Sequence, residues 1–162
     1  MRILRTALGS LLLVAALGAC TSEDDEPYQA SIGPNERTER LDALGFAIVT
    51  DGEGNGRVVG TLLNTTDEPA ALVSAEVDSE RGPVTAALLE EEIDLPPGEP
   101  VELARVPAVS VQADDLPVGF FVELTLELDD GSTVDLLVPV EPQEGPYAEI
   151  EVVTPPDGDV TP

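Results

Sequence analysis

Carboxylates dominate the side chains of this sequence that could do chemistry. The 162 residues include 33 Asp and Glu against seven Arg, with no Lys and no His, and the formal net charge is −26. Many carboxylate pairs could serve acid–base catalysis, so no single pair is informative. A serine or cysteine hydrolase would lack the His that usually acts as its base. We therefore predict that the protein is not an enzyme.

The single cysteine, Cys20, ends an apolar run near the N-terminus. Arg2 and Arg5 precede that run, and basic residues followed by a short apolar stretch are typical of a signal peptide. The stretch is shorter than the roughly 20 residues that a membrane-spanning helix needs, which disfavours a retained transmembrane helix. We predict that residues 1–19 are a signal peptide that is removed.

Leu17, Gly18 and Ala19 precede Cys20, and together they resemble the lipobox of bacterial lipoproteins. The resemblance implies that the Cys20 thiol receives a diacylglyceryl group and that Cys20 becomes the first residue of the mature chain. The alternatives are a free thiol or a small apolar residue near an ordinary cleavage site. Two acyl chains anchor a protein stably, so we expect lipid anchoring at the extracytoplasmic face of the cell membrane.

Two acidic stretches hold enough oxygen atoms to suggest a metal ion. Asp51–Gly56 matches the opening of a calcium loop, but Leu62 stands at the twelfth position, where the bidentate Glu would be. A Gly-rich turn between strands is the favoured interpretation. Glu90–Glu92 and Asp94 form an acidic run, which is usually a solvated face. We assign no metal site and no cofactor.

The charge balance excludes two classes of partner. The chain has no cationic stripe that could neutralise phosphates, so we predict no binding to nucleic acid. An acidic body is also repelled by anionic lipid. The membrane would therefore hold the protein through the lipid on Cys20 rather than through its surface.

Short β-strands are the elements that must position these residues. Between residues 120 and 128, apolar side chains alternate with Glu and Thr, and Asp129–Ser132 then precedes a second alternating run. This pattern predicts a half-buried hairpin, with Phe120 on its apolar face. Similar runs predict an all-β fold of about seven strands, an Ig-like or cupredoxin-like antiparallel β-sandwich. The predicted strands are 44–49, 57–64, 70–77, 84–89, 101–103, 120–128 and 134–140.

The predicted β-sandwich domain spans residues 42–140. Residues 20–41 are polar and acidic, which is typical of a flexible linker between a lipid anchor and a domain. Residues 141–162 are rich in Pro and are predicted to form a tail. Within this tail, residues 148–153 could add one edge strand.

Several strand and turn signals occur in an order that resembles the periplasmic PCu(A)C copper-chaperone family. The chain is still more similar to the actinobacterial LpqE-like lipoproteins, whose function is poorly defined. The resemblance covers about residues 44–140 and implies a cupredoxin-like fold. It rests on Gly60–Asn64, Leu95–Leu103, Pro117–Gly119, Val122–Leu126, Asp130–Val134 and Val138–Val140.

The copper ligands of that family are missing from this chain. The family holds Cu(I) with His and Met side chains, which suit that ion, and its closing His-x-Met pair would fall near Val106–Ser110. This sequence has no His, and its one Met is Met1, in the predicted signal peptide. The resemblance therefore implies the fold, and no residue receives a copper-ligand role.

Three functional hypotheses remain. The favoured one is a non-catalytic, membrane-anchored binding or interaction module of the cell envelope, and the resemblance makes a terminal oxidase of the respiratory chain a candidate partner. Its expected mark is an exposed apolar patch or edge strand on an acidic body. The alternative is a metal-homeostasis protein, similar to a copper chaperone, with a lost or altered metal site. An enzyme is the third, and no constellation supports it.

Overall fold

The computed structural model describes residues 33–106 and 108–153. The predicted signal peptide, its lipobox residues Leu17, Gly18 and Ala19, and the lipidation site Cys20 lie outside the described residues. No helix in the described part is long and apolar enough to cross a membrane. The elements are β1 (Glu36–Arg37), β2 (Leu41–Thr50), β3 (Asn55–Asn64), β4 (Ala70–Asp78), β5 (Val84–Leu88), β6 (Ile93–Leu95), β7 (Pro100–Glu102), β8 (Val109–Ala113), β9 (Phe121–Leu128), β10 (Thr133–Pro142) and the 3₁₀ turn η1 (Gly145–Tyr147).

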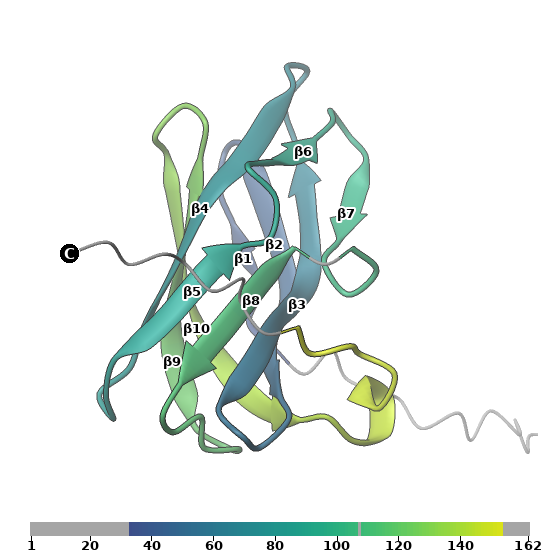
Figure 1. Cartoon of the computed structure of the whole chain (residues 1–162). Coiled ribbons are helices and arrows are strands. Elements are labelled where there is room, and N and C mark those ends of the chain that lie inside the picture. Colours follow the sequence, from purple (N-terminus) through teal and green to yellow (C-terminus); the bar gives the residue numbers. More distant parts are fainter. Residues whose placement is uncertain (1–32, 107, 154–162) are drawn as a thin grey trace, which may run out of the picture. The chain divides into compact units, whose positions relative to one another are not determined.

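The strands form one strongly curled sheet that folds back on itself as a half-barrel (Figure 1). The hydrogen-bonded order is β5-β8-β3-β2-β10-β9-β4-β6, with β1 added to β2 and β7 added to β3. Neighbouring strands are antiparallel except β10 and β2, which pair in parallel where Val140 lies opposite Ile48. The predicted all-β, Ig-like or cupredoxin-like fold is confirmed.

Strand β10 joins the two halves of the sheet. Its first part, from Thr133 to Pro139, pairs with β9, and its end, from Val140 to Pro142, pairs with β2. The core lies inside the curl, where Phe46, Ile48 and Leu72 are fully buried. One strand therefore fixes the two halves around a common core.

The predicted hairpin of β9 and β10 is confirmed. The four apolar side chains from Val122 to Leu128 are buried, whereas Glu123 and Glu127 are exposed. The prediction that Phe120 lies on the buried face is wrong, because its side chain is 46% exposed. The reason is local: Gly119 has a φ of 84°, and β9 begins only at Phe121.

Three short strands were not predicted. β6 and β8 carry buried apolar residues, but β6 lies within an acidic and Pro-rich stretch, and the middle residue of β8, Ser110, is polar yet buried. β1 falls inside the predicted linker 20–41 and pairs with β2, and the Asn35 side chain accepts a hydrogen bond from the Gly45 N–H at 2.9 Å. The C-terminal end of the predicted linker, from Asn35 to Leu41, is therefore part of the domain.

The C-terminal segment packs on the outside of β2 and β3. Tyr147, Ile150 and Val152 lie against a small cluster formed by Ala47, Val49 and Val59. No strand forms between residues 148 and 153, so the edge strand considered there is absent. The segment is held instead by side chains, including the Gln143 amide, which donates to the Ile150 carbonyl at 2.6 Å.

Candidate functional site

Val106–Ser110, where the resemblance would place the family's closing ligand pair, lies in a loop and in β8. Val109 and Ser110 are buried, and the Ser110 hydroxyl donates to the Ala87 carbonyl at 3.2 Å. Pro107 lies outside the described residues. In the described ranges, no group of three or more His, Cys, Asp or Glu side chains could hold a metal ion.

Arg57 of β3 is a buried cation that contacts the loop formed by residues 103–106. Its Nη2 donates to the carbonyl oxygens of Leu103 at 2.7 Å, Ala104 at 3.2 Å and Val106 at 2.7 Å. Its Nη1 donates to the Glu151 carbonyl at 3.1 Å. Burial lowers the pKa of Arg57, and the nearby Glu151 carboxylate opposes that effect. The guanidinium ties the 103–106 loop to the C-terminal segment.

The charge of Arg57 has an electrostatic consequence for this end of the fold. A guanidinium remains protonated at physiological pH, and like charges repel strongly where water is excluded. A second cation beside the 103–106 loop would therefore be disfavoured. Sequence reasoning missed this residue, although a lone Arg followed by Val58 and Val59 in a predicted strand was a usable signal.

The two acidic stretches considered for a metal ion are the turn between β2 and β3 and an exposed run around β6. The Asp51 carboxylate accepts hydrogen bonds from the Glu53 N–H at 2.7 Å and the Asn55 amide at 2.8 Å. The turn between β2 and β3 is thus closed by its own side chains, which confirms the interpretation as a Gly-rich turn. Glu90–Glu92 and Asp94 are all exposed, as expected for a solvated face.

The most distinctive surface lies at the start of β9. Phe120, Phe121 and Leu137 are 46%, 60% and 57% exposed, and all three line a cavity of about 780 Å³. Leu137 points outward because its neighbours in β10, Leu136 and Val138, point into the core. We call this cavity, together with these three side chains, the phenylalanine cavity.

Backbone hydrogen bonds hold the loop that presents this surface. The Gly119 N–H donates to the Val140 carbonyl at 2.8 Å, and the Val140 N–H donates to the Phe120 carbonyl at 2.8 Å. Phe120 is thereby fixed against β10 rather than being free to turn into the core. The positive φ of Gly119 makes this reversal possible, since residues with a Cβ seldom adopt it.

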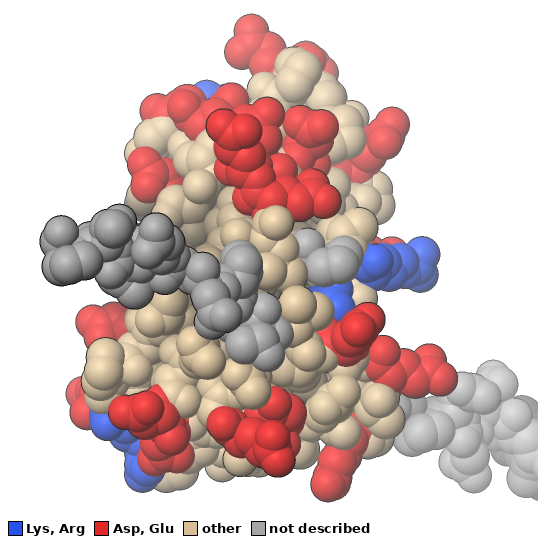
Figure 2. All heavy atoms as spheres, viewed as in Figure 1, with Lys and Arg blue, Asp and Glu red and all other residues tan. Residues whose placement is uncertain are grey.

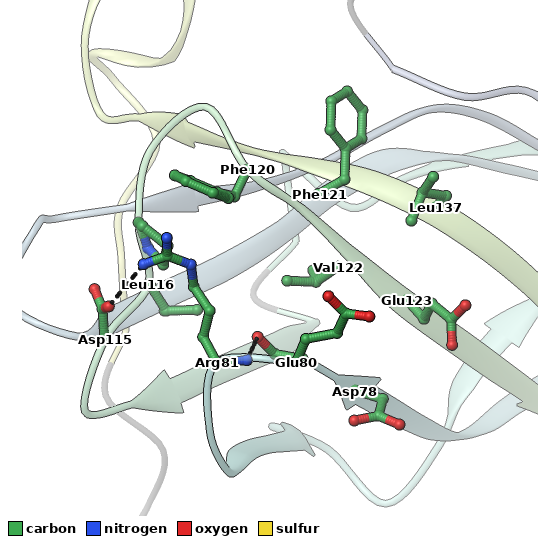
Figure 3. A pocket seen from close by; sticks show the side chains of 12 residues that line it. Asp78, Glu80, Arg81, Asp115, Leu116, Phe120, Phe121, Val122, Glu123 and Leu137 are labelled. Carbon is green, nitrogen blue, oxygen red and sulfur yellow. Dashed lines mark hydrogen bonds and ion pairs between the residues drawn. The ribbon is translucent and has the colours of Figure 1, made fainter.

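Arg81, in the loop between β4 and β5, closes one side of the cavity. Its guanidinium carbon lies 3.9 Å from the centre of the Phe120 ring, a cation–π contact, and its Nη1 lies 3.4 Å from an Asp115 carboxylate oxygen (Figure 3). Such a contact is worth about 0.5–1 kcal/mol at an exposed site. In the described part of the chain, Phe121 makes no such contact.

Carboxylates surround the rest of the cavity. Asp78, Glu80, Asp115 and Glu123 line it, and Asp78 lies opposite Glu123 in the pairing of β4 with β9. On the face drawn in Figure 2, acidic side chains likewise cover much of both ends, with few basic ones. The expected exposed apolar patch on an acidic body is therefore present.

The fold of this chain is similar to that of solved protein structures. No family model and no curated protein matches the chain. Among solved structures, the apo PCuAC domain from PmoF1 matches with a TM-score of 0.57 and 23% identity, covering 67% of this chain and 99% of that domain. The copper-bound PCuAC domain from PmoF2 matches with a TM-score of 0.53 and 22% identity, covering 67% and 98%. The chain has a PCuAC-like fold.

The PCuAC-like fold confirms the family resemblance at the level of architecture. The apo PCuAC domain of PmoF2 matches equally well, with a TM-score of 0.54 over 69% of this chain. Identities this low establish the fold alone. The closer similarity to LpqE-like lipoproteins stays a prediction.

Proposed function

We propose that the protein is a non-catalytic component of extracytoplasmic metal homeostasis, related to copper chaperones in fold, with a lost or altered metal site. The observation that carries the proposal is the PCuAC-like fold, which it shares with a copper-bound domain. Val109 and Ser110, near the position of the family's closing ligand pair, are buried and lack the soft donors that Cu(I) prefers. Its role would then be exerted through contact with another protein.

The phenylalanine cavity supports the second part of the proposal, that the protein acts as a binding or interaction module. Large exposed apolar side chains grouped in one hollow mark interaction sites on soluble domains. The lipid predicted on Cys20 would keep that surface at the outer face of the cell membrane, among envelope proteins. A terminal oxidase is one candidate partner under this proposal.

The metal part of the proposal is tested by deleting the gene in the source organism and restoring it. We expect the deletion to change the copper concentration that halves growth by at least about twofold, and to change the copper content of the membrane fraction. Restoration with the native gene should reverse both effects. Equal copper tolerance and equal membrane copper with and without the gene would overturn a role in copper homeostasis.

A second measurement separates a lost metal site from an altered one. The full chain is isolated from membranes in mild detergent, and its metal content is measured before and after addition of Cu(I) with a competing chelator. A lost site predicts no copper retained against the chelator. Stoichiometric retention would instead show an altered site and would contradict the view that the protein acts only through protein contact.

A further inference from the structure

The phenylalanine cavity leaves apolar surface exposed to water at a position where the fold does not require it. Phe121 and Leu137 are the two most exposed large apolar side chains in the described part of the chain. Each belongs to a strand whose buried face is already filled by other residues, so neither contributes to the core. Covering them with a partner would release the water that they order, which favours association.

Three of the four carboxylates that line the cavity have no counter-ion among the described residues. Among the described residues, Asp78, Glu80 and Glu123 form no salt bridge, and Arg81 is already paired with Asp115. Asp78 and Glu123 are direct neighbours across the β4–β9 ladder, an arrangement that is destabilising in the free protein. A cation placed between them would relieve that repulsion.

This charge distribution decides between the occupants that could cover the apolar side chains. A second copy of the chain would bring the same carboxylates to the contact, with a net charge of −26 on each copy. The chain's own segments 21–32 and 154–162 contain Asp and Glu but neither Lys nor Arg. An anionic membrane surface is disfavoured for the same reason. Complementarity calls for a positively charged partner.

We propose that the phenylalanine cavity binds a segment of another protein that carries Lys or Arg on both sides of an apolar side chain. The apolar side chain covers Phe121 and Leu137, and the cations lie against Asp78, Glu80 and Glu123. This inference rests on the proposed function in one respect, that the protein acts by protein contact. It does not depend on copper.

The test uses the full chain and a fluorescent peptide in which Lys alternates with Leu and Phe. Binding is measured by fluorescence anisotropy at low and at physiological salt. We expect saturable binding that the double variant Phe121→Ser, Leu137→Ser weakens at least about tenfold, as for residues at the centre of an interface. The matched control is Val73→Ser, which changes another exposed apolar side chain, one that does not line the cavity.

The role of the rim is tested with neutral substitutions. Asp78→Asn combined with Glu123→Gln should weaken binding several-fold at low salt and flatten its salt dependence, because screening acts on the removed charges. Glu127→Gln, on the same strand but outside the cavity, should change neither quantity. All variants are compared by thermal unfolding, so that loss of binding is separated from loss of folding.

Three results would overturn the proposal. The first is equal binding of a peptide in which Glu replaces Lys, and the second is unchanged binding by the Phe121→Ser, Leu137→Ser variant. The third is binding of the Cys20→Ser chain to phosphatidylcholine vesicles that is lost when Phe121→Ser and Leu137→Ser are added, which would indicate a lipid surface instead. The copper tolerance of the deletion strain is measured without the peptide, so the two proposals can fail separately.

Discussion

Asp78 and Glu123 lie opposite each other in the pairing of β4 with β9, so that two carboxylates of like charge are neighbours at the rim of the phenylalanine cavity. A like-charge pair at directly opposite positions costs roughly 0.2–1 kcal/mol. The sheet would be more stable with a neutral residue at either position. Sites that break a local rule of stability are often functional sites.

We expect Glu123→Gln to raise the free energy of unfolding by a few tenths of a kcal/mol, up to about 1 kcal/mol, because it removes this repulsion. Urea or thermal unfolding measures the change. Glu127→Gln is the control, since Glu127 lies opposite the uncharged Ser74 and Thr133 and should shift stability much less. A destabilised Glu123→Gln variant would mean that the two carboxylates do not repel each other.

Arg57→Met should destabilise the domain by about 3 kcal/mol or more. The substitution removes the donor to the buried carbonyl group of Leu103 and to the partly buried carbonyl groups of Ala104 and Val106. A buried group left without a partner carries a large desolvation cost. Chemical denaturation gives the magnitude, and amide exchange should accelerate in the 103–106 loop. Arg105→Met, at a side chain that is 78% exposed, should change stability by less than about 0.5 kcal/mol.

Two leucines on the β9–β10 hairpin provide a matched test of its orientation. Leu124→Ala should cost about 2–5 kcal/mol, because Leu124 is fully buried. Leu137→Ala should leave stability nearly unchanged, because more than half of that side chain is already in water. Similar losses for the two variants in thermal unfolding would contradict the assignment of inner and outer faces.

The Asp51 turn predicts a dependence of stability on acid. Slight burial raises the pKa of Asp51, but hydrogen bonds from Asn55 and from backbone N–H groups outweigh it and hold the pKa below its usual 3.8. Since the folded-state pKa is depressed, the stabilisation is present above the unfolded value and is lost as pH falls through the folded one. Asp51→Asn should therefore lower the unfolding temperature at pH 7 and lose that effect below about pH 3. An equal effect at both pH values would contradict an ionised Asp51.

The predicted anchor is tested at Cys20. Cys20→Ser removes the only thiol that could carry lipid, so the protein should move from the membrane fraction to the soluble exported fraction. Fractionation with an antibody to the domain measures this, and Ser22→Ala is a control that leaves the thiol in place. A Cys20→Ser protein that stays fully with the membrane would refute lipid anchoring.

Much of the fold was predictable because its signal is local. The hairpin of β9 and β10 follows from alternation over consecutive residues, and the turn before Thr133 has Gly131 at a φ of 80°. β8 was missed because Ser110 is buried among neighbours from other strands, which no local pattern reveals. Phe120 was placed on the wrong face because the alternation in the sequence starts one residue before Phe121, where β9 begins.

The sequence predicted the type of candidate site but not its position. The acidic composition and the lack of ligands indicated a binding surface rather than a catalytic centre, and an apolar patch was expected. Its position was not, because Arg81, Asp115 and Leu137 come from three separate segments that only the topology of the sheet brings together. The buried role of Arg57 likewise depends on carbonyl groups far along the chain.

The position of β10 in the sheet also determines when the domain can complete its folding. β2 begins at Leu41, yet one of its two long neighbours, β10, ends at Pro142. Contacts between such distant parts of a chain form late and slowly, because a long loop must close first. The core around Phe46 thus stays open until nearly all of the domain has emerged. A chain built in this way remains unfolded for longer after synthesis, which is the state that passage through a narrow membrane pore requires.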